Sequence, residues 1–186
     1  MAKGSKYSLI TQGVFSVLLI FLGAGCQNIY TEAYLTQPSS GLVLDRKIPA
    51  YVAVPADGVD DHGTYQGSGI KVAGAIQNAF AQKLQTVFGG AGHESLDTAL
   101  VSARNRGAGY LFYPTILQWE NNPTEWTYER DHLQIKIELL DVSSGGTIHS
   151  TIFSGKSKLM TFGDVPEDML PEPLAKYANF FSYRDN

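Results

Sequence analysis

The acidic and histidine side chains that could do chemistry are spaced without a known catalytic or metal-binding pattern. Asp57, Asp60, Asp61 and His62 fall in one glycine-rich loop, and oxygen ligands at such spacing could hold Ca²⁺. The EF-hand register and its distal glutamate are absent, so we interpret this cluster as a solvated acidic loop. The four histidines of the chain are scattered, and no helical pair four residues apart supports a zinc site. We therefore expect no metal ion and no other cofactor.

Two further patterns come close to an enzyme motif without completing it. Gly67-Ser68-Gly69 resembles part of a dinucleotide-binding loop, but Val72 occupies the third glycine position, so we interpret it as a loop leading into a helix. Glu120, Glu125 and Glu129 could in principle pair for glycoside hydrolysis, yet three glutamates in a polar loop favour simple solvation. A nucleophile elbow is absent, and no Ser-His-acid triad can be assembled from the sequence. We expect the protein not to be an enzyme.

Aromatic residues flank a polar loop in the second half of the chain, where Trp119, Trp126 and Tyr128 lie close together. Aromatic and arginine side chains concentrate at binding hot spots. We expect Trp119 to end a strand in the core. We expect Trp126 and Tyr128 to be the candidate partner-binding residues.

The only cysteine, Cys26, follows a segment typical of a secretory leader: Lys3 and Lys6, an apolar run over 14–22, and small residues over 23–25. A run of nine residues is too short to span a bilayer, which takes roughly 20. The stretch before Cys26 resembles the lipobox of bacterial lipoproteins. That resemblance implies cleavage before Cys26, covalent attachment of lipid (diacylglycerol and palmitate), and anchoring to the membrane. Gln27 in place of an aspartate implies sorting to the outer membrane, with the domain facing the periplasm.

The sequence divides into a signal peptide (1–25), the lipidated cysteine with a tether (26–40), and a single globular domain (41–186). The full chain carries a net charge of −4, and the segment over 1–25 contains two lysines and no acid. The mature protein is therefore more acidic still. An acidic protein without a basic run is unsuited to nucleic acid, so we expect no nucleic-acid partner.

The pattern of apolar residues predicts strands alternating with helices. A helix over 68–88 has Ser68 as N-cap and ends at Gly89-Gly90; a second helix runs from Ser95 to Arg106. Pro114 suggests an edge position or bulge in its strand. Strands are predicted at 51–54, 92–94, 110–119, 133–139 and 147–154, a hairpin turn at 143–146, and a last helix over 173–183. The fold class is therefore α/β (α+β), a mixed β-sheet with helices on one side: strand-helix-strand-helix-strand, then an antiparallel hairpin and a C-terminal helix.

Two stretches, 99–120 and 139–177, resemble a proteobacterial lipoprotein family catalogued as domain of unknown function 4823. The similarity rests on Arg106-Gly107-Ala108, the strand beginning Tyr110-Leu111, and Thr161-Phe162-Gly163-Asp164 followed by 166–170. The similarity covers most of the mature chain from about Tyr51. It implies a location in the cell envelope and a fold, but no catalytic residues. The order of elements is also similar to the N-terminal domain of the Tol-Pal translocation protein and to curli-secretion-type lipoproteins.

These observations favour a non-enzymatic envelope lipoprotein that binds an envelope protein partner or its own copies. One alternative is a periplasmic binding module for a small ligand or glycan, which would use the loop over 57–67 and the aromatic loop. A hydrolase with an unrecognised site is a further alternative.

Overall fold

The computed structural model describes residues 28–34, 41–61, 63–122, 130–157 and 165–185. The expected signal peptide, the lipid-attachment residue Cys26, and the candidate binding residues Trp126 and Tyr128 lie outside the described residues. No helix in these described ranges is long and apolar enough to cross a membrane.

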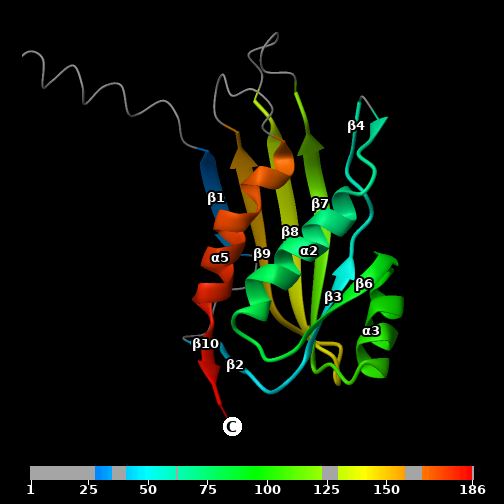
Figure 1. Ribbon diagram of the computed structural model, residues 1–186, viewed down its shortest axis with the longest axis vertical. Coiled ribbons are helices and arrows are strands. Elements are labelled where there is room, and N and C mark those ends of the chain that lie inside the picture. The colour runs from blue at the N-terminus through cyan, green and yellow to red at the C-terminus, as the bar shows by residue number, and fades with distance from the viewer. Residues whose placement is uncertain (1–27, 35–40, 62, 123–129, 158–164, 186) are drawn as a thin grey trace, which may run out of the picture.

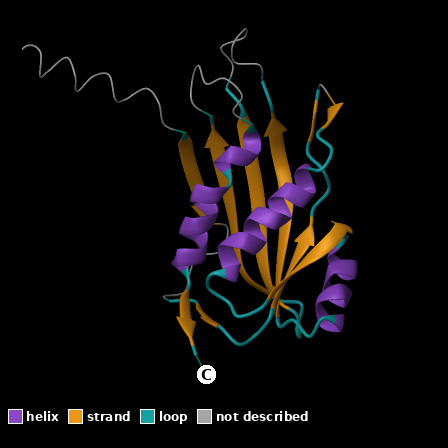
Figure 2. Cartoon of the chain, viewed as in Figure 1, coloured by secondary structure: helices purple, strands orange, loops and turns teal. Residues whose placement is uncertain are grey.

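The centre of the molecule is a mixed six-stranded sheet in the order β1-β9-β8-β7-β3-β6 (Figures 1 and 2). Strand β3 is parallel to both of its neighbours, and the other pairs are antiparallel. The predicted mixed sheet is thus confirmed. The bounds are β1 Ile29–Tyr34, β3 Ala50–Val54, β6 Val87–His93, β7 Tyr110–Glu120, β8 His132–Asp141 and β9 Thr147–Lys156. Two small sheets pair β2 (Val43–Asp45) with β10 (Ser182–Arg184), and β4 (Val59–Asp60) with β5 (Gly63–Thr64).

Helices cover the two faces of the sheet unequally. Helices α2 (Ser68–Ala81) and α5 (Pro171–Phe180) lie over one face, as Figure 1 shows. Helix α3 (Leu96–Asn105) packs on the opposite face, where Ala99 and Ala103 contact a smaller cluster. The expectation of helices on one side of the sheet therefore holds for α2 and α5 and is wrong for α3. The usual right-handed crossover explains this placement. The chain moves outward from β3 to β6 through α2, then back past β3 to β7 through α3, so the two helices fall on opposite faces.

Strand β8 shows how the alternation of residues builds the main core. Leu133, Ile135, Ile137 and Leu139 are buried in the cluster beneath α2 and α5, and the residues between them are half-buried and polar. The strand predicted at 133–139 is confirmed. So are the hairpin turn, where Gly145 has φ 71°, and the strand containing Pro114. Strand β3 pairs with β7 only over 110–112, so Pro114 lies beyond the part of β7 that is paired with β3.

The first helix ends earlier than the sequence predicts. Helix α2 stops at Ala81, and β6 begins at Val87, so Gly89 and Gly90 belong to a strand and do not terminate a helix. The predicted helix over 68–88 is therefore wrong beyond residue 81. The glycine at 89 has a packing reason, because a Cβ there would lie 2.7 Å from Gln77 Oε1.

Both ends of the described chain hold strands that the sequence analysis did not predict. Residues 29–34, expected within an irregular tether, form β1 and pair with β9 along their whole length. The side chain of Tyr30 in β1 packs against the main core. The last helix begins at Pro171 and ends at Phe180, after which β10 pairs in parallel with β2. The link over 166–173 contains a short 3₁₀ helix, η1 (Pro166–Met169).

Candidate functional site

A β-bulge at Leu117 arranges the polar side chains at one end of the sheet. The register of β7 against β8 shifts between Ile116, opposite Ile135, and Gln118, opposite Gln134. The extra residue lets Ile116 and Trp119 both face the core while Gln118 turns to the other face. Trp119 is only 2% exposed, which confirms its expected core position.

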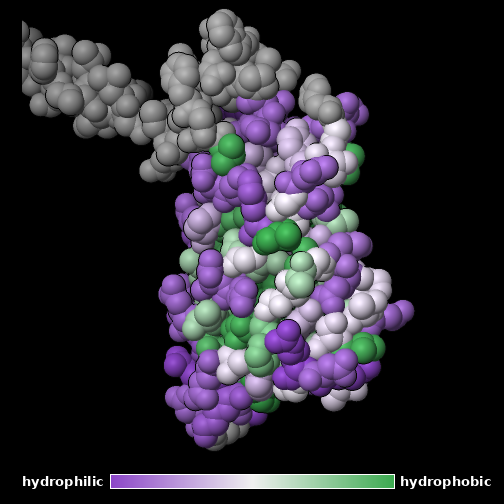
Figure 3. Space-filling view, turned by 45° about the vertical axis from the view of Figure 1, so that its right-hand side comes forward, coloured by the Kyte–Doolittle hydropathy of each residue, from purple (hydrophilic) through white to green (hydrophobic). Residues whose placement is uncertain are grey.

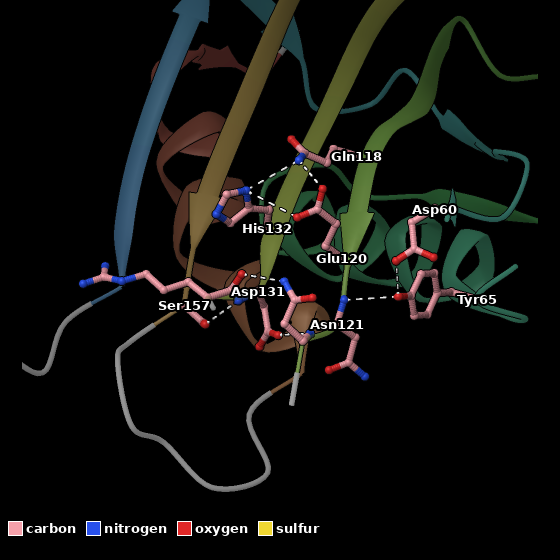
Figure 4. Close-up of polar contacts among 10 residues, drawn as sticks. Asp60, Tyr65, Gln118, Glu120, Asn121, Asp131, His132 and Ser157 are labelled. Carbon is pink, nitrogen blue, oxygen red and sulfur yellow. Dashed lines mark hydrogen bonds and ion pairs between the residues drawn. The ribbon is translucent and has the colours of Figure 1, made fainter. Parts of the chain in front are cut away.

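Gln118, Glu120 and His132 meet on the face of the sheet opposite α2 and α5 (Figure 4). The Gln118 side-chain amide donates to Glu120 Oε1 at 2.6 Å, and Glu120 Oε2 lies 3.5 Å from His132 Nδ1. All three side chains are partly exposed. The group can donate and accept hydrogen bonds to a partner surface.

The ends of the expected aromatic loop are held by a buried carboxylate. Asp131 is 2% exposed, and its Oδ1 accepts a hydrogen bond from the backbone N–H of Asn122 at 2.7 Å. Its own backbone N–H donates to Ser157 Oγ at 3.0 Å. The Asn122 side chain donates to the carbonyl of Arg130 at 2.9 Å. These bonds fix the points where residues 123–129 leave and rejoin the sheet; Trp126 and Tyr128 fall within that segment, outside the described residues.

The hairpin of β4 and β5 is tied to the same end of the sheet. Tyr65 donates its hydroxyl hydrogen to Asp60 Oδ2 at 2.5 Å and accepts one from the backbone N–H of Asn121 at 3.3 Å (Figure 4). Burial and the hydrogen bond to the Asp60 carboxylate raise the pKa of Tyr65 above its ordinary value. Gly58 allows this hairpin to approach the sheet, because a Cβ there would lie 2.5 Å from Trp119 Cβ.

Asp57 serves the fold as the cap of α2. Its Oδ1 accepts from the backbone N–H of Gly69 at 2.8 Å and its Oδ2 from that of Gly67 at 3.0 Å. The bond from Gly69 is the main cause that lowers the pKa of Asp57. Ser68 is therefore not the N-cap: Gly67 takes that place, with φ 83°. The amides that would cradle a phosphate are bound to the protein's own carboxylate.

The loop expected to be simply solvated and acidic is therefore structured by two of its carboxylates, those of Asp57 and Asp60.

Among the residues that the structure describes, no group of three or more His, Cys, Asp or Glu side chains could hold a metal ion. His149, one of the scattered histidines, is fully buried and its Nδ1 lies 3.1 Å from the Tyr177 hydroxyl.

The open face of the sheet carries the Gln118, Glu120 and His132 group. We use this term for the face of β1, β9, β8 and β7 opposite α2 and α5. Lys136 and Glu138 form an ion pair on it at 2.9 Å, and Gln134 donates to Ser154 Oγ at 2.9 Å. A shallow hollow of about 240 Å³ lies on it, lined by Ile29, Thr31, Gln118, His132, Gln134, Ser154 and Lys156 among others.

The helix-bearing face offers a second hollow, of about 480 Å³, between α2 and α5. It is lined mainly by alanines and amides: Ala75, Asn78, Ala79, Gln82, Ala175, Ala178 and Asn179. Figure 3 shows small apolar patches interspersed with polar groups over the visible surface, without one large apolar area.

A comparison of the sequence with models of known protein families identifies the family of this chain. Residues 42–181 match the model of the family described as "Domain of unknown function (DUF4823)", so the protein belongs to this family. The resemblance that the sequence carried is confirmed. No curated protein matches the sequence.

Solved structures share the fold at low sequence identity. A PelC dodecamer from Paraburkholderia phytofirmans aligns with a TM-score of 0.61 and 16% identity, covering 86% of this chain and 100% of that chain. The lipoprotein GNA1162 from Neisseria meningitidis aligns with a TM-score of 0.49 and 15% identity, covering 72% of this chain and 96% of that chain. At such identity the PelC likeness defines the fold class alone.

Proposed function

We propose that the protein is a non-enzymatic assembly module of the bacterial cell envelope, which associates with its own copies and is anchored by lipid on Cys26. The observation that carries the proposal is the open face. Of the helices in the described part of the chain, α2 and α5 lie on the other side of the sheet, and α3 packs beside the open face, over β3, β6 and the adjoining ends of β7 and β8. A sheet face left open in this way is suited to lie against another protein surface.

The side chains of the open face support a reversible, polar interface. Lys136–Glu138 and Gln134–Ser154 are already paired within the chain, so less side-chain freedom is lost when a partner docks. Non-obligate interfaces are about as polar as the rest of a protein surface.

The fold likeness supports self-association as the form of assembly. The PelC structure that shares this fold is a dodecamer, so a domain with this fold can assemble into an oligomer of its own copies. We infer that copies of this chain are the first partner to test. The envelope location and outer-membrane anchoring rest on the leader, on Cys26 and on Gln27.

Two matched charge reversals test the proposal. Lys136 on the open face pairs with Glu138 at 2.9 Å, and Lys176 on α5 pairs with Glu172 at 2.8 Å. Light scattering of the soluble Cys26→Ser protein should give a mass above that of the monomer. K136E should shift that mass toward the monomer while K176E leaves it unchanged. A monomer at every concentration would contradict self-association, and an equal effect of both reversals would contradict the assigned face.

Binding of a small ligand or glycan is the second candidate, and one observation favours it. A hollow of about 220 Å³ lies where β4–β5 meets β7, lined by Tyr65, Gln66, Lys71, Trp119 and Asn121 among others. Aromatic and polar groups together are typical of such sites. A ligand that binds there should raise the melting temperature of the native protein, and Lys71→Ala should abolish the shift.

A further inference from the structure

The anchor point and the sheet are separated by almost no chain. Cys26 precedes the first described residue, Asn28, by two positions, which is at most about 7 Å of fully extended backbone. Asn28 itself donates through its side chain to the Tyr30 hydroxyl at 3.0 Å. The domain therefore begins immediately after the residue on which we propose the lipid is carried.

Strand β1 is firmly part of the sheet. Each of its residues pairs with β9, from Ile29 opposite Lys156 to Tyr34 opposite Thr151. Thr151 Oγ1 also donates to the carbonyl of Ala33 at 3.2 Å, and Tyr30 packs against the main core. A segment held in this way cannot act as a flexible spacer that lifts the domain away from its anchor.

The start of β1 defines one end of the molecule. Figure 1 places it beside the end of β9, at the same end of the sheet as the end of β7 and, at the far edge, the β4–β5 hairpin. This end carries exposed apolar side chains on two separate elements, Ile29 at 52% and Val59 at 64% exposed. Strands β2 and β10 lie at the opposite end (Figure 1). The ten-residue strand β8 spans between the ends, a length of roughly 30 Å at about 3.3 Å per residue.

We propose that the end formed by the start of β1 and the β4–β5 hairpin rests on the phospholipid bilayer, with Ile29 and Val59 at the headgroup layer. This inference rests on the proposed lipid anchor at Cys26. The link between Cys26 and Asn28 is too short to hold the sheet away from the membrane. This end of the sheet therefore lies against the bilayer. The opposite end, with β2 and β10, then points into the aqueous compartment, and the open face stands beside the membrane, free for lateral contact between copies.

The single cysteine makes the test selective. A lipidated Cys26 is a thioether and does not react with maleimides, so one introduced cysteine is the only labelled site. Full-length lipidated protein carrying Ile29→Cys or Val59→Cys is labelled with a fluorophore and reconstituted into phosphatidylcholine vesicles that contain headgroup spin-labelled lipid. Val43→Cys on β2 and Val101→Cys on α3 are the matched controls, since these residues are 49% and 52% exposed.

The expected result is strong quenching at positions 29 and 59 and retained fluorescence at 43 and 101. Quenching that is equal at all four positions, or stronger at 43 and 101, would overturn the orientation while leaving the anchor in place. The unlabelled protein is also floated with vesicles, beside Cys26→Ser as the control that should not float. If the wild-type protein does not float either, the lipid anchor itself is wrong and the orientation falls with it.

Discussion

Asp57 caps helix α2 through the backbone of Gly69, whose N–H donates to the carboxylate at 2.8 Å. The carboxylate comes from the loop before the helix and satisfies amides that the helix leaves without an internal partner. Its negative charge also lies at the positive end of the helix dipole. The part of the loop that contains Asp57 is therefore fixed to α2.

Replacing Asp57 with alanine should cost about 1 kcal/mol of unfolding free energy, the typical loss for a helix cap. Asp61→Ala is the control, because Asp61 is an exposed acid of the same loop and should change stability little. The pKa of Asp57 is lowered in the folded state, so its contribution is present at neutral pH and is lost as the pH falls below about 3.9, the unfolded value. Urea unfolding at pH 7 measures both variants; equal losses would contradict the capping role.

Two glycines of the same helix should respond to alanine with opposite signs. A Cβ on Gly69 would lie 2.3 Å from the Pro55 carbonyl oxygen, whereas one on Gly74 meets nothing within 4 Å. Gly74→Ala should stabilise the protein by about 0.5–1 kcal/mol through helix propensity. Gly69→Ala should destabilise it, because backbone must move. Thermal unfolding of both variants checks the pair, and a stabilised Gly69→Ala would contradict the close approach.

Stability should fall as the pH drops below about 6.5 because His149 is buried in its neutral form. Burial lowers the pKa of His149, so the unfolded chain binds a proton between the ordinary value near 6.5 and the lowered folded value. The unfolding free energy then decreases toward acid by up to about 1.4 kcal/mol per pH unit. His149→Phe should flatten this slope between pH 7.5 and 5.5 in urea titrations. An unchanged slope in the variant would assign the dependence to other groups.

The two tryptophans should differ in what they support. Trp126→Ala is expected to leave folding intact and weaken partner binding, as the sequence predicts for an aromatic residue in a polar loop. Trp119→Ala should lower the unfolding free energy by about 3–5 kcal/mol, since Trp119 is 2% exposed in the main core. Thermal melting followed by circular dichroism measures the effect on stability, and a binding or self-association assay measures the effect on partner binding. A large loss of stability in Trp126→Ala would contradict the binding role.

The secondary-structure elements that the sequence predicted correctly are those that depend on residues close to one another in the chain. The alternation of β8, the Ser95 cap of α3, whose side chain accepts from the Thr98 N–H at 3.3 Å, and the Gly145 turn all follow from neighbouring residues. The end of α2 was missed because the apolar spacing continues to Val87, and pairing of β6 with β3 overrides it. Such tertiary pairing outweighs helix propensity.

The candidate site was less predictable for a related reason. Gln118 and His132 come together only because the bulge at Leu117 changes which face Gln118 occupies, and no residue type at 117 signals a bulge. The attachment of β1 depends on pairing between Ile29 and Lys156, which lie far apart in the sequence. A composition typical of a tether does not reveal a partner strand so distant. Cys26, by contrast, was singled out by its local leader pattern, and its lipidation stays a prediction.

Site-specific photocrosslinking in cells tests the central claim of self-association through the open face most directly. A photoreactive amino acid replaces Gln134 on the open face, or Asn78 on the exposed side of α2, in the full-length protein. The account predicts that position 134 yields a discrete adduct between two copies of this chain, identified by mass spectrometry, and that position 78 does not. The absence of any self-adduct from position 134, with the protein expressed and in the membrane fraction, would contradict it.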